Sequence, residues 1–451
     1  MVTALSALLS LSIAGQLLAA PDSVNGGEYP DNSQDEHFHL TEEQRWAIER
    51  RLELQREKMR SQGVFPLPSG MSTAQPEFVW PVVPAAHVDY AGVDAISNYV
   101  DNDANFPDQI LDYNCGGRSY DLSSGYNHSG IDIFLWPFSW QMMEDNDGEI
   151  VAAAPGIIIG KDDGNNDQSC GFGGGSWNAV YVEHGDGSIA WYGHMKKNSL
   201  TTKNVGDSVV AGEFLGVVGS SGNSTGPHLH MEVYDASGNL IDPYAGSCNV
   251  FNAQSWWKEQ PDYYEPAINR LATGTAPPSF NNCPTPATTN FSNTHIAGTS
   301  LYMLAFYRDQ LNTSSSQLSL VDSTGSTFDN WSFTSSEPHY AASYWFWNYA
   351  NFTPNRPRGG WTFNNSYNNT DYSHEFFYVD TCDTIETLDS VTVNASQTGY
   401  GASNYITTAN SVSVTNNADL ALVAGNKVVL NNGFSVASGS KARIDLGDVC
   451  S

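Results

Sequence analysis

The chain has 451 residues, more than a single hydrophobic core usually holds, so we expect about two to four domains. Its 49 acidic residues outnumber its 19 basic residues, and the formal net charge is −30. Contacts with nucleic-acid phosphates need lysine and arginine, so this balance argues against nucleic-acid binding. A strongly acidic surface also keeps an exported protein in solution, and this simpler interpretation of the charge is at least as good as any functional one.

Residues 1–20 have the apolar core and the small-residue end of a signal peptide, although they lack the usual positively charged start. A transmembrane anchor is the alternative, but the segment is short, rich in serine and not followed by charged residues that would stop transfer. No other stretch is long and apolar enough to span a bilayer. We therefore expect an exported protein without stable membrane insertion.

Residues 21–75 differ in composition from the rest, and we interpret them as a propeptide that contains the one long helix of the chain. Thr41 and Gln44 form a capping-box pattern, which marks the start of a helix. A partial apolar stripe follows, made of Trp46, Ile48, Leu52 and Met59. This helix holds many of the arginines, so docking onto the acidic remainder of the chain is one hypothesis and a solvated charged helix is the other.

Two histidines, His37 and His39, flank Phe38 just before this helix. Such a pair could block a metal site elsewhere in the chain. So short a motif more often represents ordinary histidines in a disordered segment, and we favour that interpretation. Several prolines and small residues between Gly63 and Pro76 mark a plausible place for cleavage.

Two segments further along the chain carry side chains that can bind a metal ion. Alternate side chains of a strand share one face, so His228 and His230 are expected to point the same way. Alone, such a pair fits a metal site, a general base beside a ligand, or a polar sheet surface. Upstream, His128 and Asp132 add an imidazole and a carboxylate. Together with His230 they make three ligands with a fourth position open, as a catalytic zinc requires.

These residues, with the strand Trp191–Met195 that contains His194, resemble the M23 family of zinc metalloendopeptidases. The resemblance covers about residues 110–247 and includes the segments 154–158, 178–187, 205–212 and 215–222. It implies that His128, Asp132 and His230 bind one Zn²⁺ ion. It also implies that His194 and His228 act beside the metal as general base and transition-state stabiliser, in roles that the sequence leaves exchangeable.

The sequence predicts a mainly β protein, because short strands alternate with Gly, Asn and Asp turns. Residues 76–260 are expected to form an antiparallel β-sheet metallopeptidase domain with a groove, in which Tyr120 and Tyr126 are more simply packing residues than groove residues. A linker over 261–287 and a β-sandwich-like accessory domain over 288–383 follow. Residues 386–451 resemble the small β-solenoid modules found at the C-terminus of secreted bacterial proteins.

Six cysteines in an exported chain predict three disulfides, for which 15 pairings are possible. Pairing of neighbours along the sequence is our expectation. The expected pairs are Cys115 with Cys170, Cys248 with Cys283, and Cys382 with Cys450.

The resemblance implies a secreted bacterial hydrolase, made as a zymogen, that cuts peptide bonds in peptidoglycan or in glycine-rich proteins such as elastin. The propeptide would dock within the same molecule. The alternative is a non-catalytic protein of the same fold that binds or regulates the cell wall. Such proteins typically lose one or more metal-site positions, whereas this chain keeps all five.

Overall fold

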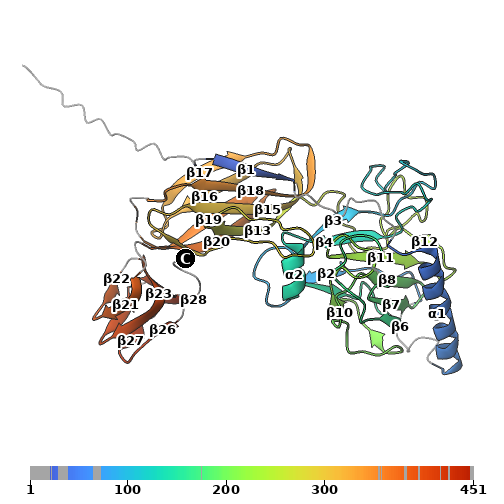
Figure 1. The fold of residues 1–451 in the computed structure, drawn as a ribbon, viewed down its shortest axis with the longest axis horizontal. Coiled ribbons are helices and arrows are strands. Elements are labelled where there is room, and N and C mark those ends of the chain that lie inside the picture. Colours follow the sequence, from blue (N-terminus) through green and yellow to red (C-terminus); the bar gives the residue numbers. More distant parts are fainter. Residues whose placement is uncertain are drawn as a thin grey trace, which may run out of the picture.

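A computed structural model describes the fold over residues 21, 23–28, 39–63, 73–173, 175–353, 356, 358–379, 383–394, 397–416, 418–424 and 427–446. Within these residues the protein is mainly β, as predicted, with two α-helices and several antiparallel sheets (Figure 1). No helix in the described part of the chain is both long and apolar enough to cross a membrane. The predicted signal peptide, residues 1–20, lies outside the described residues.

An eight-stranded antiparallel sheet, the central sheet, forms the middle of residues 94–241. Its strands run in the order β3-β4-β11-β8-β7-β6-β9, and β12 pairs with β11. The strands are β3 (Asp94–Asn98), β4 (Ile131–Leu135), β6 (Gly156–Asp162), β7 (Ala179–His184), β8 (Ile189–Gly193), β9 (Ser208–Val209), β11 (His228–Tyr234) and β12 (Leu240–Ile241). The strands β4, β11 and β8 thus lie side by side, although they are far apart in sequence.

Each face of the central sheet has a different role because side chains alternate along every strand. On β11, Leu229, Met231 and Val233 are fully buried in the main hydrophobic core. That core also packs against a small sheet with the order β10-β5-β2 and against one short helix. These elements are β10 (Phe214–Val217), β5 (Gly148–Val151), β2 (Val82–Pro84) and α2 (Ser139–Asp145). The alternate residues of β11 therefore face away from this core.

Helix α1 (Glu42–Ser61) covers that other face (Figure 1). Its capping box is confirmed, since Thr41 and Gln44 bond reciprocally. Leu52 and Met59 are buried against the central sheet, in a cluster that includes Tyr181. The predicted apolar stripe is wrong at Trp46, which is 61% exposed. Ile48 packs partly buried against the same cluster, so the stripe holds α1 from Ile48 onward.

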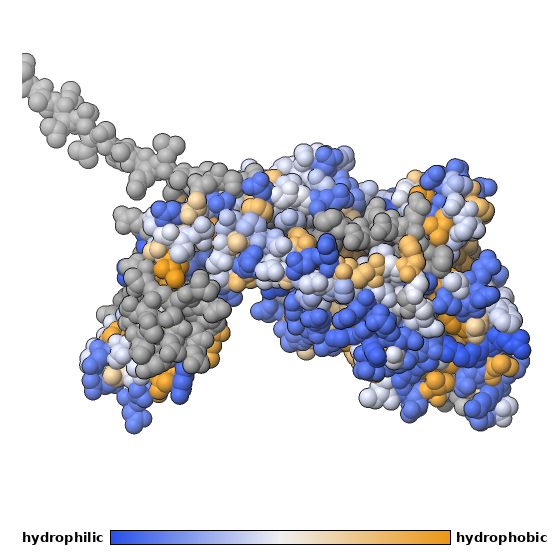
Figure 2. Space-filling model, in the orientation of Figure 1, coloured by the Kyte–Doolittle hydropathy of each residue, from blue (hydrophilic) through white to orange (hydrophobic). Residues whose placement is uncertain are grey.

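Ion pairs add to this contact between α1 and the central sheet. They join Arg45 to Glu232, Arg51 to Asp162 and Arg56 to Glu183. All three cations belong to α1 and all three carboxylates to the sheet. Figure 2 shows that the visible surface of this part of the molecule is mostly hydrophilic. Its hydrophobic residues are scattered rather than gathered in one large patch.

Two further sheets pack face to face as a sandwich with its own core. One sheet has the order β1-β18-β15-β13, with strands β1 (Ser23–Glu28), β13 (Ala267–Gly274), β15 (Leu301–Leu311) and β18 (His339–Tyr349). The other has the order β14-β20-β19-β16-β17, with strands β14 (Thr294–Ile296), β16 (Ser316–Val321), β17 (Thr327–Phe333), β19 (Gly359–Tyr367) and β20 (Thr370–Val379).

Two strands of the sandwich differ from the sequence-based expectation. Strand β13 occupies part of the segment 261–287, which the sequence predicted to be a linker. Its residues do not alternate between buried and exposed, and a proline-rich stretch follows it, so no strand pattern was visible. Strand β1 comes from the N-terminal segment and pairs with β18, from Ser23 opposite Asn348 to Glu28 opposite Ser343. Such long-range strand pairing leaves no local signal in the sequence.

The C-terminal residues form two small sheets in which every described pairing is parallel. Their orders are β21-β23-β25-β28, with β26 on β23, and β22-β24-β27. The strands are β21 (Asp383–Asp389), β22 (Thr392–Asn394), β23 (Gln397–Ala409), β24 (Val412–Thr415), β25 (Asp419–Ala424), β26 (Lys427–Val429), β27 (Phe434–Val436) and β28 (Lys441–Leu446). The resemblance to a known solenoid module stays a prediction.

Within the described residues, the chain forms two disulfides, Cys115–Cys248 and Cys170–Cys283. The expected pairing of neighbours along the sequence is therefore wrong for these four cysteines. Each disulfide instead joins segments more than 100 residues apart, 133 and 113 residues respectively, that the fold brings together. The third expected pair, Cys382 with Cys450, lies outside the described residues.

Candidate metal centre

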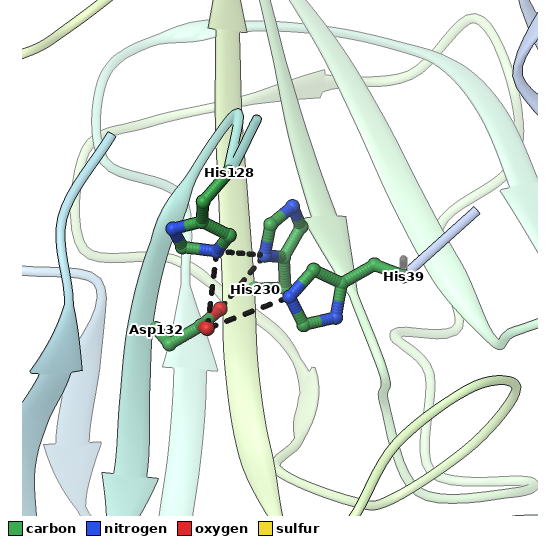
Figure 3. A group of neighbouring side chains, drawn as sticks. All are labelled: His39, His128, Asp132 and His230. Atoms are coloured by element: carbon green, nitrogen blue, oxygen red, sulfur yellow. Dashed lines mark hydrogen bonds and ion pairs between the residues drawn. The ribbon is translucent and has the colours of Figure 1, made fainter. Parts of the chain in front are cut away.

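Two neighbouring strands of the central sheet bring a carboxylate and an imidazole together. Asp132 on β4 lies directly opposite His230 on β11, so the two side chains share one face. Oδ1 of Asp132 lies 2.7 Å from Nδ1 of His230. His128, in the loop before β4, places Nε2 3.0 Å from Oδ2 of Asp132 and 3.3 Å from Nδ1 of His230 (Figure 3). The three predicted metal ligands therefore meet at one point.

The hydrogen bonds around these imidazoles leave one nitrogen of each ring available to a metal. Nδ1 of His128 lies 2.7 Å from the carbonyl oxygen of Tyr99, which can only accept, so Nδ1 carries the hydrogen. Nε2 of His230 lies 2.9 Å from Oε1 of Glu232 and donates to it. The lone pairs of His128 Nε2 and His230 Nδ1 then both face Asp132. Metal-binding histidines in proteins are oriented by such partners.

The electrostatics of the group also favour a cation. Although burial alone would raise the pKa of the Asp132 carboxyl, the imidazoles of His128, His39 and His230 hold that pKa well below its usual range. Burial disfavours a charged His230, but Asp132 and Glu232 raise its pKa to about 9. When no metal is bound, the His230 ring therefore carries an extra proton, and a metal ion would displace that proton.

Two further histidines lie beside this group. His228 on β11 has its Nε2 3.7 Å from Oδ1 of Asp132, and the rings of His194 and His228 are 4.5 Å apart. Nδ1 of His194 donates to the carbonyl of Ser221 at 2.6 Å, and Nδ1 of His228 donates to the carbonyl of Gly226 at 2.8 Å. Each ring therefore presents a basic Nε2 to the site.

The environment of His194 keeps this ring neutral. Burial, followed by the neighbouring His228 and His230, lowers the pKa of His194 well below its ordinary value. His194 also has a positive φ of 59°, which is uncommon for a residue other than glycine. Such a backbone conformation persists only where the surrounding structure enforces it, and it is frequent at functional sites.

A sixth side chain, His39, comes from the N-terminal segment and enters the centre of the group. It is fully buried, and its ring lies 3.8 Å from that of His230 (Figure 3). Its Nδ1 is 2.7 Å from Nε2 of His194, and its Nε2 is 3.4 Å from Oδ2 of Asp132. The favoured interpretation of this residue as an ordinary disordered histidine is therefore wrong. His37 lies outside the described residues.

Tyr120 lies against the same group. Its hydroxyl is 2.7 Å from Nε2 of His39, and its ring stacks on His128 with centroids 4.6 Å apart. Tyr120 is thus a packing residue of the site, as the simpler expectation held, and it also provides a hydroxyl there. The sequence could have predicted that the Tyr120 hydroxyl lies at the site, because Tyr120 precedes His128 by only a few residues.

Sequence reasoning missed Glu232, which supports the site from outside. Glu232 follows His230 by two positions on β11, so it shares the same face and reaches Nε2 of that ring. It is fully buried, and it also accepts from Arg45 of α1 and from Ser129. The alternation that placed His228 beside His230 would have placed Glu232 there as well.

The described residues contain two overlapping groups whose ligand atoms lie within 4.8 Å of one another. One is His39, His128, Asp132 and His230, and the other is His39, His194 and His228. All five residues named from the sequence are therefore in one place, and each is at most 2% exposed. The arrangement can hold a metal ion with two basic imidazoles beside it.

Comparisons with known proteins find relatives of the region that contains these residues. Residues 126–243 match the family described as Peptidase family M23. The DD-carboxypeptidase/endopeptidase Mpg of Neisseria meningitidis is 41% identical over 92 residues, which are 20% of this chain and 18% of the relative. The glycyl-glycine endopeptidase ALE-1 of Staphylococcus capitis is 34% identical over 110 residues, which are 24% of this chain and 25% of the relative.

Solved structures of the same kind are also similar. The catalytic domain of lysostaphin from Staphylococcus simulans has 27% identity and a TM-score of 0.21, and the match covers 28% of this chain and 83% of that one. The catalytic domain of the M23 protein EnpA from Enterococcus faecalis has 28% identity and a TM-score of 0.21, with 38% and 96% covered.

These similarities concern one region of the chain. The match spans only about a fifth to a quarter of the length of the two curated relatives named above. Within that region, the family match and the gathered histidines and aspartate point the same way. Residues 126–243 of this chain are therefore a domain of peptidase family M23.

Proposed function

We propose that this chain is a secreted bacterial zinc metalloendopeptidase that hydrolyses peptide bonds in peptidoglycan cross-links or in glycine-rich proteins such as elastin. The observation that carries the proposal is the convergence of His128, Asp132 and His230 on one point. The names of two relatives, a glycyl-glycine endopeptidase and a DD-carboxypeptidase/endopeptidase, support a peptide substrate with small residues.

The three ligands are of the type that zinc prefers in catalytic sites, two neutral imidazoles and one carboxylate. His128 would bind through Nε2 and His230 through Nδ1, since the other nitrogen of each ring is already hydrogen-bonded. A zinc ion held there supplies Lewis-acid polarisation of the scissile carbonyl. Glu232 would keep the His230 ring in place while this occurs.

The two remaining histidines handle the proton. His228 has its Nδ1–H fixed on the carbonyl of Gly226, so Nε2 can accept a proton from the attacking water and return it to the departing amine. His194, whose Nε2 also faces this space, would stabilise the charge that develops on the carbonyl oxygen once that nitrogen carries a proton to donate. Both rings face the same space, so these two roles are exchangeable.

We further propose that residues 1–20 direct export and that residues 21–75 are a propeptide docked on the domain that it serves. The three ion pairs between arginines of α1 and carboxylates of the central sheet support docking. In each pair an arginine of the helix meets a carboxylate of the sheet, which is the kind of contact that the docking hypothesis predicts. Release of this segment would convert a zymogen to the active peptidase.

The alternative is a wall-binding protein that keeps the fold without catalysis. Loss of a ligand would favour it, but His128, Asp132 and His230 are all present and share one site. Retention of His194 and His228 beside them also favours the enzyme, because a binding protein has no need of two fixed bases.

Metal content and hydrolysis of purified cell walls test the proposal. We expect about one zinc per wild-type chain, and release of new amino groups from walls once the N-terminal segment has been removed by limited proteolysis. His230→Ala should lose both properties. His339→Ala, which changes a histidine paired with Asp309 in the sandwich, is the matched control and should keep both. A folded wild type with neither zinc nor hydrolysis would favour the binding-protein alternative.

A further inference from the structure

We infer that His39 is a fourth ligand of the metal centre and closes that centre in the full-length chain. The inference rests on the proposed function, since it assumes that His128, Asp132 and His230 hold zinc. It adds a ligand from a segment that lies outside the M23 domain, residues 126–243. It also predicts a coordination state that differs from the open site of an active peptidase.

The hydrogen-bond directions determine which nitrogen of His39 faces the metal position. His194 donates from Nδ1 to the carbonyl of Ser221, so its Nε2 can only accept in the neutral ring. Nδ1 of His39, 2.7 Å away, must therefore be the donor. The lone pair of His39 is then on Nε2, which is the nitrogen turned toward Asp132. In the absence of a metal this lone pair accepts from the Tyr120 hydroxyl at 2.7 Å, and a bound metal ion would replace that hydrogen bond.

The position of this lone pair suits a ligand. Nε2 of His39 lies 3.4 Å from Oδ2 of Asp132, a separation expected of two atoms that share one small cation. The ligand atoms of His39, His128, Asp132 and His230 all lie within 4.8 Å of one another. One zinc ion could bind all four of these residues, through three imidazole nitrogens and one carboxylate oxygen. Structural zinc sites are closed in this way, whereas catalytic sites keep one position open.

The same ring also occupies one of the proposed catalytic groups. Its Nδ1–H bonds to Nε2 of His194, the nitrogen that would act on the substrate. One residue thus fills the open coordination position and takes the lone pair of a neighbouring base. A peptide carbonyl could reach neither while His39 is in place.

The residues that follow His39 hold it there. Leu40 is buried in the cluster between α1 and the central sheet. Gln44 donates to the carbonyl of Gly175, and Arg45 binds Glu232. Because these contacts fix the segment on the domain, His39 is a tethered ligand, and its high effective concentration favours ligation over exchange with solvent.

Cobalt(II) in place of zinc tests the inference directly, because zinc itself has no visible spectrum. The full-length chain would be loaded with cobalt as wild type and as His39→Phe, which keeps a ring over the site but removes both nitrogens. We expect wild type to give a closed-site spectrum that added azide does not change. In His39→Phe the spectrum should shift and respond to azide, and zinc should transfer to a chelator roughly tenfold faster or more.

Near-ultraviolet circular dichroism would verify folding, with His39→Gln as a second variant should His39→Phe fail that check. His87→Phe, at a histidine paired with Asp147, is the control and should match wild type. Identical spectra, azide responses and zinc transfer rates in wild type and His39→Phe would overturn the inference and leave the proposed function standing. A folded wild type that binds neither metal would overturn both.

Discussion

Arg45 of α1 binds the carboxylate of Glu232 through both terminal nitrogens, Nη1 to Oε2 at 2.5 Å and Nη2 to Oε1 at 2.7 Å. The same Oε1 accepts from Nε2 of His230 at 2.9 Å. One buried carboxylate therefore connects the N-terminal helix to a proposed metal ligand. Burial would raise the pKa of Glu232, but Arg45 and His230 hold it well below its usual range.

The first prediction concerns Arg45→Met. This change leaves the fully buried Glu232 without its guanidinium partner, and removing one member of a buried ion pair costs about 3 kcal/mol or more. We expect α1 to leave the central sheet more often in the variant. Hydrogen exchange of the α1 amides should then be faster by roughly a hundredfold, because exchange reports the free energy of local opening.

Arg50→Met is the matched control for this experiment. Arg50 lies on the same helix, but its guanidinium contacts only the exposed ring of Trp46 among the interactions seen for it, with the two 5.5 Å apart. Exchange should change little there. Equal acceleration in both variants would mean that the helix responds to any lost charge, and the bidentate contact would have no special role.

Much of the site could be predicted because its signals are local. Alternation along a strand places His228 and His230 on one face, and the capping box of Thr41 and Gln44 marks the start of α1 within the sequence itself. The convergence of His128 and Asp132 with His230 followed from resemblance and not from spacing, because that convergence depends on which strands become neighbours.

The features that were missed depend on contacts between distant segments. His39 lies 93 positions before Asp132, which it approaches to 3.4 Å, and nothing in a three-residue motif reports such a contact. The disulfide partners were wrong for the same reason, since Cys115 was matched with a neighbour in sequence and not with Cys248. Tertiary packing decides these pairings.

The second prediction concerns the disulfide Cys170–Cys283, which joins the glycine-rich segment before Trp177 to the loop between β13 and β14 of the sandwich. Replacing both cysteines by serine releases a loop of 113 residues in the unfolded chain. The chain-entropy account gives a loss of about 5 kcal/mol. Urea unfolding under oxidising conditions should show a lower midpoint and a steeper transition slope, because the unfolded chain without this cross-link is less compact and exposes more surface.

Peptide mapping without reduction provides the control for the pairing itself. It should recover a peptide pair that contains Cys170 with Cys283 and another that contains Cys115 with Cys248. Recovery of a Cys115–Cys170 peptide instead would contradict the fold around both segments and restore the pairing of sequence neighbours.

The third prediction is a pH dependence that originates in the sandwich. Burial, the largest cause, lowers the pKa of His295 to about 4, against 6.5 for the unperturbed residue. As pH falls through 6.5, the unfolded chain therefore takes up a proton that the folded chain does not. Stability is lost from there downward, by about 2 kcal/mol at pH 5 from this residue.

His295→Gln isolates this contribution, because glutamine does not titrate and can still donate to the carbonyl of Ser292, which His295 Nε2 reaches at 3.0 Å. The free energy of unfolding would be measured for both proteins at pH 7 and pH 5. Wild type should lose about 2 kcal/mol more than the variant over this range. Parallel pH profiles of the two proteins would show that His295 takes up its proton equally in the folded and the unfolded chain.

The fourth prediction concerns Gly130, which lies between His128 and Asp132. A Cβ atom at this position would lie 2.6 Å from Cε1 and 2.8 Å from Nε2 of the His230 ring. Neither separation is compatible with real contacts, so Gly130→Ala must displace the imidazole or the backbone. Since that ring donates from Nε2 to Glu232, its orientation toward the metal would be lost as well.

We expect Gly130→Ala to lower zinc affinity by roughly 10- to 100-fold, the usual effect of disturbing the groups that orient a metal ligand. Competition with a chromogenic chelator measures the change. Gly226→Ala is the matched control in the loop before His228, since a Cβ there meets no atom within 4 Å, and its affinity should equal that of wild type. If Gly130→Ala bound zinc as tightly as the control, His230 would not be a ligand in the orientation described.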